Sequence, residues 1–165
     1  MVEVVLRAVR VDVGSSTPLL LLEEVGGDRV LPIFIGAPEA TAIAFAVQGV
    51  ATPRPMTHDL LRDVVESLGA RLQRVVITEL RSATYFAELH LDRDGATMQV
   101  SSRPSDAVAL AVRTGSPLFV ADDLMDADSV VLPPEDESDD DVNPDELVGQ
   151  FRRFLDEVRP EDFSS

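Results

Sequence analysis

The first 132 residues alternate between short hydrophobic runs and segments rich in glycine, proline and serine, which is typical of a chain with many short elements. In the first half the pattern predicts strands at residues 2–13, 17–24 and 29–35, separated by glycine-rich turns. The second of these contains four consecutive leucines, so we expect it to be covered on both faces. An alanine-rich helix is expected at 38–48. It is apolar nearly all round, which predicts burial.

The second half has a similar order. An amphipathic helix is expected at 57–68, with Gly69 as its C-terminal cap. Three strands then follow at 71–80, 85–91 and 96–101, the last two joined by the hairpin signal Asp94-Gly95. An alanine-rich helix at 103–113, a short strand at 117–121 and a helical turn at 122–128 complete this part of the chain.

Each half therefore contains three strands followed by an alanine-rich helix that begins with proline and a carboxylate. The aligned helices pair Glu39 with Asp106, which suggests an internal βββα repeat. Short alanine-rich helices also resemble each other by composition alone, so the repeat is a hypothesis. The predicted fold class is α+β: two β-meander-plus-helix halves that form a mostly antiparallel or mixed sheet packed against the alanine-rich helices.

Beyond residue 132 the composition changes. Between residues 133 and 143 every charged residue is acidic and two prolines occur, which predicts a disordered linker. Residues 144–158 have the spacing of an amphipathic helix, whose apolar face needs a surface of its own protein, a neighbouring subunit or another protein to cover it. The expected organisation is one domain at 1–132, a linker at 133–143, and a helix with a tail at 144–165.

The composition excludes several classes of site. There is no cysteine, and all 14 basic residues are arginine, so thiolate and lysine catalysis are both excluded. No apolar run approaches the length of about 20 residues that spans a bilayer, and the N-terminus does not have the order of a signal peptide. We therefore expect a cytoplasmic protein without a membrane partner.

The net charge of −16 is spread over the whole chain. Residues 133–165 hold 12 acidic and 3 basic residues, and residues 1–132 hold 18 acidic and 11 basic residues. The domain is thus acidic without its tail, which argues against a broad phosphate-binding surface. A local cleft lined with arginine remains compatible with nucleic acid, because arginine contacts phosphate through a bidentate guanidinium.

The segment 53–61 is the most unusual in the domain. Two prolines stiffen it, and it contains His58, one of only two histidines, beside Asp59. Thr57 is predicted to be the N-cap of the helix that follows, and Asp59 then lies where the helix dipole favours negative charge. His58 is therefore expected on a rigid corner.

Several segments, taken in order, resemble the bifunctional nuclease family. They are Leu31-Pro32-Ile33-Phe34-Ile35-Gly36, Glu39-Ala40, Pro53-Arg54-Pro55-Met56-Thr57-His58-Asp59-Leu60-Leu61 and Arg103-Pro104-Ser105-Asp106-Ala107. The resemblance covers about residues 1–132, and the final segment from Phe151 to Phe163 resembles the ends of actinobacterial members. It implies an α+β domain, hydrolysis of phosphodiester bonds in both DNA and RNA, and assembly into homo-oligomers. It supplies no catalytic assignment.

The candidate chemistry follows from what phosphodiester hydrolysis needs. Glu39, Asp59 and Asp106 are candidate catalytic carboxylates and candidate ligands of Mg²⁺ or Mn²⁺, with Glu79 as a further ligand candidate. His58 is a candidate general base or acid. Candidate phosphate-binding residues are Arg54 and Arg103.

Each of these residues also has a purely structural interpretation. Acids in the first turn of a helix stabilise it by about 0.3–1 kcal/mol without any other role, and the arginines can serve as their ion-pair partners. His90 lies outside the family segments and is expected to be structural. Two hypotheses therefore remain: a nuclease, metal-assisted or not, and a non-catalytic oligomeric module whose motif residues form an ion-pair network and whose C-terminal helix binds another protein.

Overall fold

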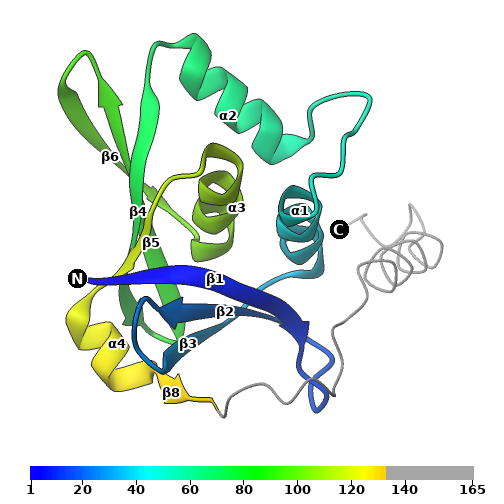
Figure 1. Cartoon of the computed structure of the whole chain (residues 1–165), viewed down its shortest axis with the longest axis vertical. Coiled ribbons are helices and arrows are strands. Elements are labelled where there is room, and N and C mark those ends of the chain that lie inside the picture. The colour runs from blue at the N-terminus through cyan, green and yellow to red at the C-terminus, as the bar shows by residue number, and fades with distance from the viewer. Residues whose placement is uncertain (133–165) are drawn as a thin grey trace.

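The computed structural model describes residues 1–132, and the predicted linker, terminal helix and tail at 133–165 lie outside the described residues. The domain that remains is an eight-stranded mixed sheet with four helices, so the predicted α+β class is confirmed (Figure 1). The elements are β1 (Val2–Val11), β2 (Pro18–Glu24), β3 (Arg29–Phe34), α1 (Ala37–Val47), α2 (Thr57–Ser67), β4 (Arg71–Arg81), β5 (Thr84–Arg93), β6 (Ala96–Ser102), α3 (Pro104–Thr114), β7 (Leu118–Val120), α4 (Asp122–Asp128) and β8 (Val130–Val131).

The order of strands across the sheet is β6-β5-β4-β7-β1-β2-β3-β8. All neighbouring strands are antiparallel except β4 and β7, which are parallel. The two meanders β1–β2–β3 and β4–β5–β6 therefore meet through β7, which comes from the end of the domain. Each meander is followed by a helix, as expected, but α2 has no counterpart and the internal repeat stays a hypothesis.

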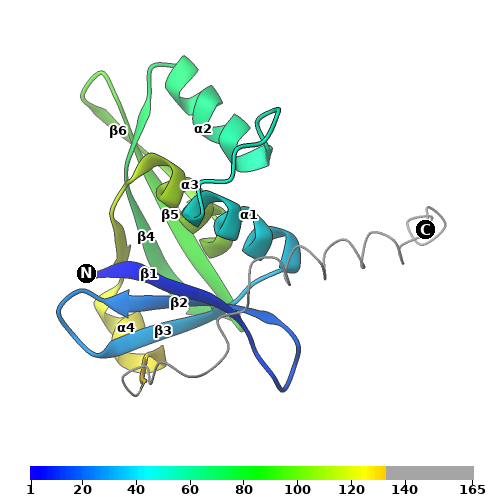
Figure 2. The same ribbon diagram turned by 45° about the vertical axis from the view of Figure 1, so that its right-hand side comes forward.

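Three helices cover one face of the sheet. Figures 1 and 2 show α1 and α3 side by side, with α2 across their ends. Buried leucine, isoleucine and valine side chains of β2 and β4 pack with those of α1 and α3 in one cluster that also contains Met125 of α4. The strong twist of the sheet sets β4–β6 upright and β1–β3 across in Figure 1, so the helices lie in a concave surface.

The sequence predicts the elements more reliably than their burial. Within residues 1–132, every expected helix or strand boundary lies within two residues of the observed one. The second strand is buried on both faces, as expected, since Leu20, Leu21 and Leu22 are all buried. The prediction that the whole of α1 is buried is wrong, because only Ala40, Thr41 and Ile43 are buried and Val47 is 60% exposed. The helix packs on one side only.

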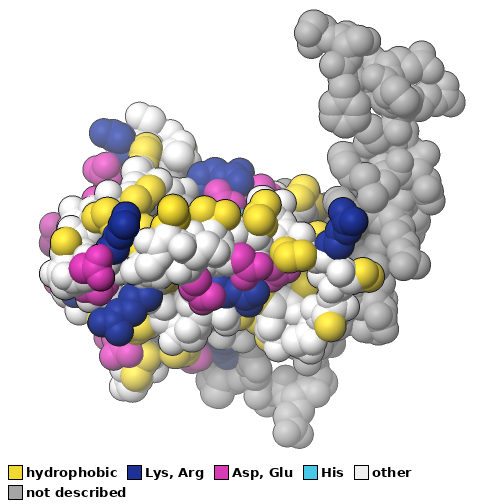
Figure 3. Space-filling model, turned by 90° about the horizontal axis from the view of Figure 1, so that it is seen from above, with side chains coloured by type: hydrophobic (Ala, Val, Ile, Leu, Met, Phe, Trp, Pro, Cys, Tyr) yellow, Lys and Arg dark blue, Asp and Glu magenta, His cyan; other side chains and the backbone are white. Residues whose placement is uncertain are grey.

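A second apolar surface is exposed on α2. Leu60, Val64 and Leu68 are spaced four residues apart, which places them on one stripe of the helix, and all three are exposed. Seen from above, hydrophobic side chains form a row across this end of the molecule (Figure 3). None of the helices within residues 1–132 has the length and hydrophobicity to cross a membrane.

Candidate functional site

The three helices of the concave face each begin with a carboxylate in the first turn. These are Glu39 in α1, Asp59 in α2 and Asp106 in α3. A proline also lies at the start of α1 and of α3, where the missing N–H costs no hydrogen bond. The sequence predicted these three positions, but their side chains divide into two separate groups in space.

The start of α2 differs from the prediction in one residue. Met56, not Thr57, is the N-cap, and Thr57 is already helical. The stabilising contact comes from inside the helix, where Oδ2 of Asp59 accepts a hydrogen bond from the backbone N–H of Met56 at 3.0 Å. A carboxylate three residues into the helix can reach back to the cap position, so a threonine cap is not needed. This contact fixes the first turn that carries His58.

The first group joins α1, α2 and α3 through four side chains. Nε2 of His58 lies 2.9 Å from Oδ1 of Asp106. Arg103 donates to both oxygens of Asp106, from Nε at 2.7 Å and from a terminal nitrogen at 3.1 Å. The same guanidinium lies 3.0 Å from Oε1 of Glu39. Four residues that the sequence nominated separately therefore form one chain of contacts, His58–Asp106–Arg103–Glu39.

This group lies at the protein surface and is only partly enclosed. The side chain of His58 is 10% exposed and that of Asp106 is 27% exposed, whereas Arg103 is 65% exposed. Nδ1 of His58 makes no hydrogen bond within residues 1–132, and it is not among the polar atoms sealed from solvent. A water or a substrate oxygen can therefore approach this nitrogen.

Hydrogen bonding keeps Asp106 ionised. Burial alone raises the pKa of this carboxyl, but the hydrogen bonds from Arg103 and His58 outweigh burial and hold its pKa below the ordinary value. Two carboxylates, those of Glu39 and Asp106, therefore share the single guanidinium of Arg103.

The second group is a clasp around a buried arginine. Nε of Arg113 lies 2.6 Å from Oδ1 of Asp59, and its terminal nitrogens donate to the backbone carbonyls of Ala109 and Ala42. One guanidinium thus ties α1, α2 and α3 together. The hydrogen bond from Arg113 is the main cause that lowers the pKa of Asp59.

The sequence analysis did not nominate Arg113. It has no motif around it, but it lies seven residues after Asp106 and therefore on the same face of α3, whose other positions are mostly buried and apolar. An arginine at a mostly buried position indicates that a carboxylate pairs with it, because a buried charge needs a partner. Which carboxylate pairs with it depends on how the helices pack.

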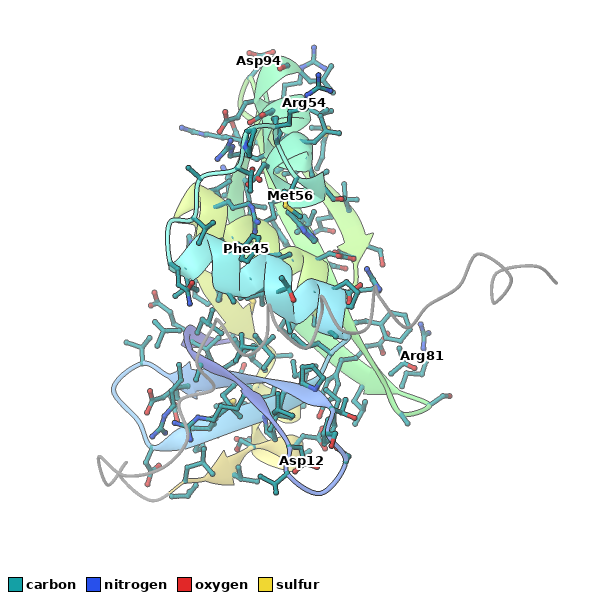
Figure 4. The ribbon with its side chains drawn as sticks, turned by 90° about the vertical axis from the view of Figure 1, so that its right-hand side faces the viewer. Asp12, Phe45, Arg54, Met56, Arg81 and Asp94 are labelled. Carbon is teal, nitrogen blue, oxygen red and sulfur yellow. The ribbon has the colours of Figure 1, made fainter. Side chains whose placement is uncertain are left out.

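The remaining candidates lie apart from both groups. Arg54 is exposed on the loop between α1 and α2, and its guanidinium makes no ion pair within residues 1–132. Figure 4 shows it beyond Met56, farther from Phe45 of α1 than Met56 is. Glu79 pairs with Arg81 at the far end of β4, and His90 is buried on β5 near Glu88 and Arg74, in agreement with a structural role.

The arrangement of the carboxylates does not suit a shared metal ion. Within residues 1–132, no three His, Asp or Glu side chains are placed so that they could hold one. Asp59 is turned toward Arg113, and Arg103 occupies the position between Glu39 and Asp106. A cation on these two carboxylates would have to displace the guanidinium.

A hollow of about 220 Å³ lies one helical turn away from the first group. Its lining includes Arg62, four residues after His58 in α2, and Leu110, four residues after Asp106 in α3. The hollow also contacts Arg71 and Leu72 of β4, so it lies between α2, α3 and β4.

Comparison with known proteins identifies relatives of this chain. The family model for the bifunctional nuclease domain matches residues 20–133. An uncharacterized protein of Mycobacterium tuberculosis is 45% identical over 99% of this chain and 98% of its own length. Bifunctional nuclease 2 of Arabidopsis thaliana is 31% identical and bifunctional nuclease 1 of Oryza sativa subsp. japonica is 29% identical. Each match covers 62% of this chain and 32% of the plant protein.

Proposed function

Because the chain belongs to the bifunctional nuclease domain family, we propose that it is a nuclease that hydrolyses phosphodiester bonds of DNA and RNA beside His58. The observation that supports this most directly is the 2.9 Å contact between His58 and Asp106, at a position where the side chain of His58 is 10% exposed and its second ring nitrogen makes no hydrogen bond within residues 1–132. A carboxylate that accepts the Nε2 proton leaves Nδ1 as the basic nitrogen. His58 is then oriented for general-base catalysis.

The roles in this proposal follow from the contacts. His58 takes a proton from a water whose oxygen attacks phosphorus, the bond from phosphorus to the leaving oxygen breaks, and that oxygen is protonated by solvent. Asp106 orients the ring and stabilises the imidazolium. Arg103, held by Glu39 and Asp106, presents its exposed edge to a phosphoryl oxygen. Arg54 contacts a phosphate farther along the strand.

Asp59 has a positioning role in this proposal. It fixes the first turn of α2 through Met56 and the helix packing through Arg113, so it determines where His58 lies without touching the substrate. Glu39 positions Arg103 in the same way.

Assistance by Mg²⁺ or Mn²⁺ stays a prediction. A divalent cation would supply charge neutralisation near the phosphoryl oxygens. Glu39 and Asp106 are the two carboxylates that would have to turn toward it, and no step of the proposal depends on it. The expected cytoplasmic location likewise stays a prediction.

The test is a nuclease assay on the purified full-length chain, with single- and double-stranded DNA and RNA. Each substrate is incubated with EDTA, Mg²⁺ or Mn²⁺. His58→Gln is expected to lower the rate by about 10²–10⁴-fold, the usual contribution of a general base. Asp106→Asn is expected to lower it as well, because the ring loses its acceptor.

His90→Gln is the matched control, since it changes the other histidine in the same way outside the site. It should keep the parent rate, provided that circular dichroism shows it to be folded. Parent protein without activity in any metal condition would refute the nuclease proposal. A folded His58→Gln variant that cleaves as fast as the parent would refute the role of His58 and would point to a contaminant.

The second candidate function, a non-catalytic oligomeric module, has one observation in its favour. The arginine of each charge group, Arg103 or Arg113, already has a carboxylate partner in the same chain. In that case His58→Gln and Asp106→Asn would alter stability but no catalytic rate. The same assay therefore decides between the two.

A further inference from the structure

The strand β6 is an unprotected edge of the sheet. Six of its seven residues are exposed and the seventh is half-buried. Its sequence, Ala-Thr-Met-Gln-Val-Ser-Ser, contains no charged residue and no proline. Exposed edge strands usually carry such residues, because a bare row of N–H and C=O groups pairs with other chains. Nothing within residues 1–132 covers this row, since β6 is the last strand on its side.

The opposite edge of the sheet is built differently. It ends in β8, which has only two residues, Val130 and Val131. A very short edge strand is one of the ordinary protections against pairing. β8 pairs with only Arg29 and Val30 of β3, and Pro32 in the rest of β3 has no N–H to donate, so β6 is the longer uninterrupted edge.

The side chains of β6 divide cleanly between the two faces. Met98 lies beside Leu91 of β5, and Val100 lies beside Leu89. Both leucines belong to the core under the helices, so Met98 and Val100 lie on the helix-covered face, where they are 40% and 45% exposed. Gln99, the residue between them, puts its polar side chain on the other face.

We propose that a second copy of this chain pairs with β6 and that the two sheets join across a twofold axis. Antiparallel pairing centred on Gln99 matches all seven residues. It sets Met98 opposite Val100 of the partner twice on the apolar face, and Thr97 opposite Ser101 twice on the polar face. Residues that face each other then agree in polarity, so the strand is complementary to itself.

Charge favours this surface for a second copy. Residues 1–132 carry seven more acidic than basic residues, so two copies repel each other over most of their surface. The uncharged β6 is a place where they can meet without opposing like charges. A foreign acidic or basic peptide would find no complementary charge there.

The exposed stripe of α2 adds to the same interface. A twofold axis perpendicular to the sheet keeps the helices of both copies on one face of the joined sheet. The exposed Leu60, Val64 and Leu68 side chains of both copies then lie on this shared face. A strand pair alone is small beside the roughly 1,600 Å² of a standard interface, so this further apolar area is needed.

The experiment is analytical ultracentrifugation of the full-length chain over a wide range of concentration. The parent is expected to dimerise. Val100→Lys puts a charge opposite Met98 of the partner on both sides of the central Gln99 pair and should raise the dissociation constant by about 100-fold or more. Met98→Glu combined with Val100→Lys sets opposite charges in register and should recover the dimer, whereas Val131→Lys on the other edge should leave it unchanged.

Several results would overturn the proposal. A parent that stays monomeric would do so, and so would a Val100→Lys variant that dimerises as the parent does, which would place the interface elsewhere. Amide hydrogen exchange adds a second readout, because β6 should be protected in the parent and unprotected in Val100→Lys. A monomeric parent with protected β6 amides would mean that another segment of the chain covers the strand. None of these results depends on nuclease activity.

Discussion

Gly36 determines where the carboxylate of Glu39 can lie. The glycine has φ −76° and ψ 156°, which any residue can adopt, so its backbone does not require glycine. A Cβ atom there would instead collide with Oε2 of Glu39. The missing side chain gives the carboxylate the space from which Oε1 reaches Arg103 at 3.0 Å.

Gly36→Ala is therefore expected to move Glu39 away from Arg103 without straining the backbone. If Arg103 contacts the substrate as proposed, the rate of cleavage should fall by about 10–100-fold, since misplacement by about 1 Å can cost that much. The free energy of unfolding should change by less than about 1 kcal/mol, because the displaced group is the end of a flexible chain. The measurements are kcat/KM and urea denaturation.

Gly27→Ala is the matched control for this prediction. A Cβ atom there also collides with a carboxylate, that of Glu24, which pairs with Arg29 at the edge of the sheet. It should leave the rate of cleavage unchanged. Equal losses in both variants would show that the effect is general destabilisation and that Gly36 has no specific role.

At the scale of elements, the Asp59–Arg113 clasp decides how α1, α2 and α3 pack. Asp59→Asn leaves the guanidinium of Arg113 without its charged partner at a side chain that is only 6% exposed. We expect the variant to be less stable than the parent by about 1–3 kcal/mol at pH 7. Equilibrium unfolding in urea measures this.

The clasp also has a predicted pH dependence. The pKa of Asp59 is lower in the folded chain than the value of about 3.9 in an unfolded one. Its contribution to stability is therefore complete above pH 4–5 and is lost as the pH falls through the folded-state pKa. The difference in unfolding free energy between parent and Asp59→Asn should shrink as the pH falls below about 4 and approach zero once the pH is below the folded-state pKa of Asp59.

Asp63→Asn tests whether this effect is specific. Asp63 pairs with its neighbour Arg62 at the surface, where the carboxylate side chain is 40% exposed. Exposed pairs are worth about 0–1 kcal/mol, so the variant should stay close to the parent at every pH. A loss at pH 7 as large as that of Asp59→Asn would contradict a special role for the clasp.

At the scale of the whole molecule, the acidic surface limits how nucleic acid can bind. Only Arg54 and Arg103 are proposed to contact phosphates, whereas the charge of residues 1–132 is negative overall. We expect a plot of log affinity against log salt concentration to have a slope no steeper than about −2, because each phosphate contact contributes about −0.9. Fluorescence anisotropy with a labelled oligonucleotide measures it.

Arg54→Ala should make that slope shallower by about 1, and Arg81→Ala should not change it. Arg81 is a matched control, since its side chain is 64% exposed at the far end of β4 and its removal changes the net charge equally. A parent slope of −5 or steeper would refute a site with two phosphate contacts. It would require a basic surface formed by more residues.

The sequence by itself determined the elements of this protein. Period-two and helical apolar patterns, broken by glycine and proline, give strands and helices whose limits are confirmed within two residues. Of the elements, β8 went unpredicted, because two residues are too few for a pattern. The family segments also contain six candidate site residues. These could be identified because short motifs in a fixed order are recognisable in the sequence without the three-dimensional structure.

Only the tertiary structure decided which of these residues meet. Glu39, Asp59 and Asp106 occupy equivalent positions in the first turns of their helices. In the structure, however, Arg103 pairs with both Glu39 and Asp106, whereas Arg113 pairs with Asp59. Helix crossing and the side-chain reach of arginine set these partners, and neither has a signature in a local pattern. The exposure of α1 also depends on tertiary packing. The composition of a helix gives its hydrophobicity, but it does not show how many of its faces contact other elements.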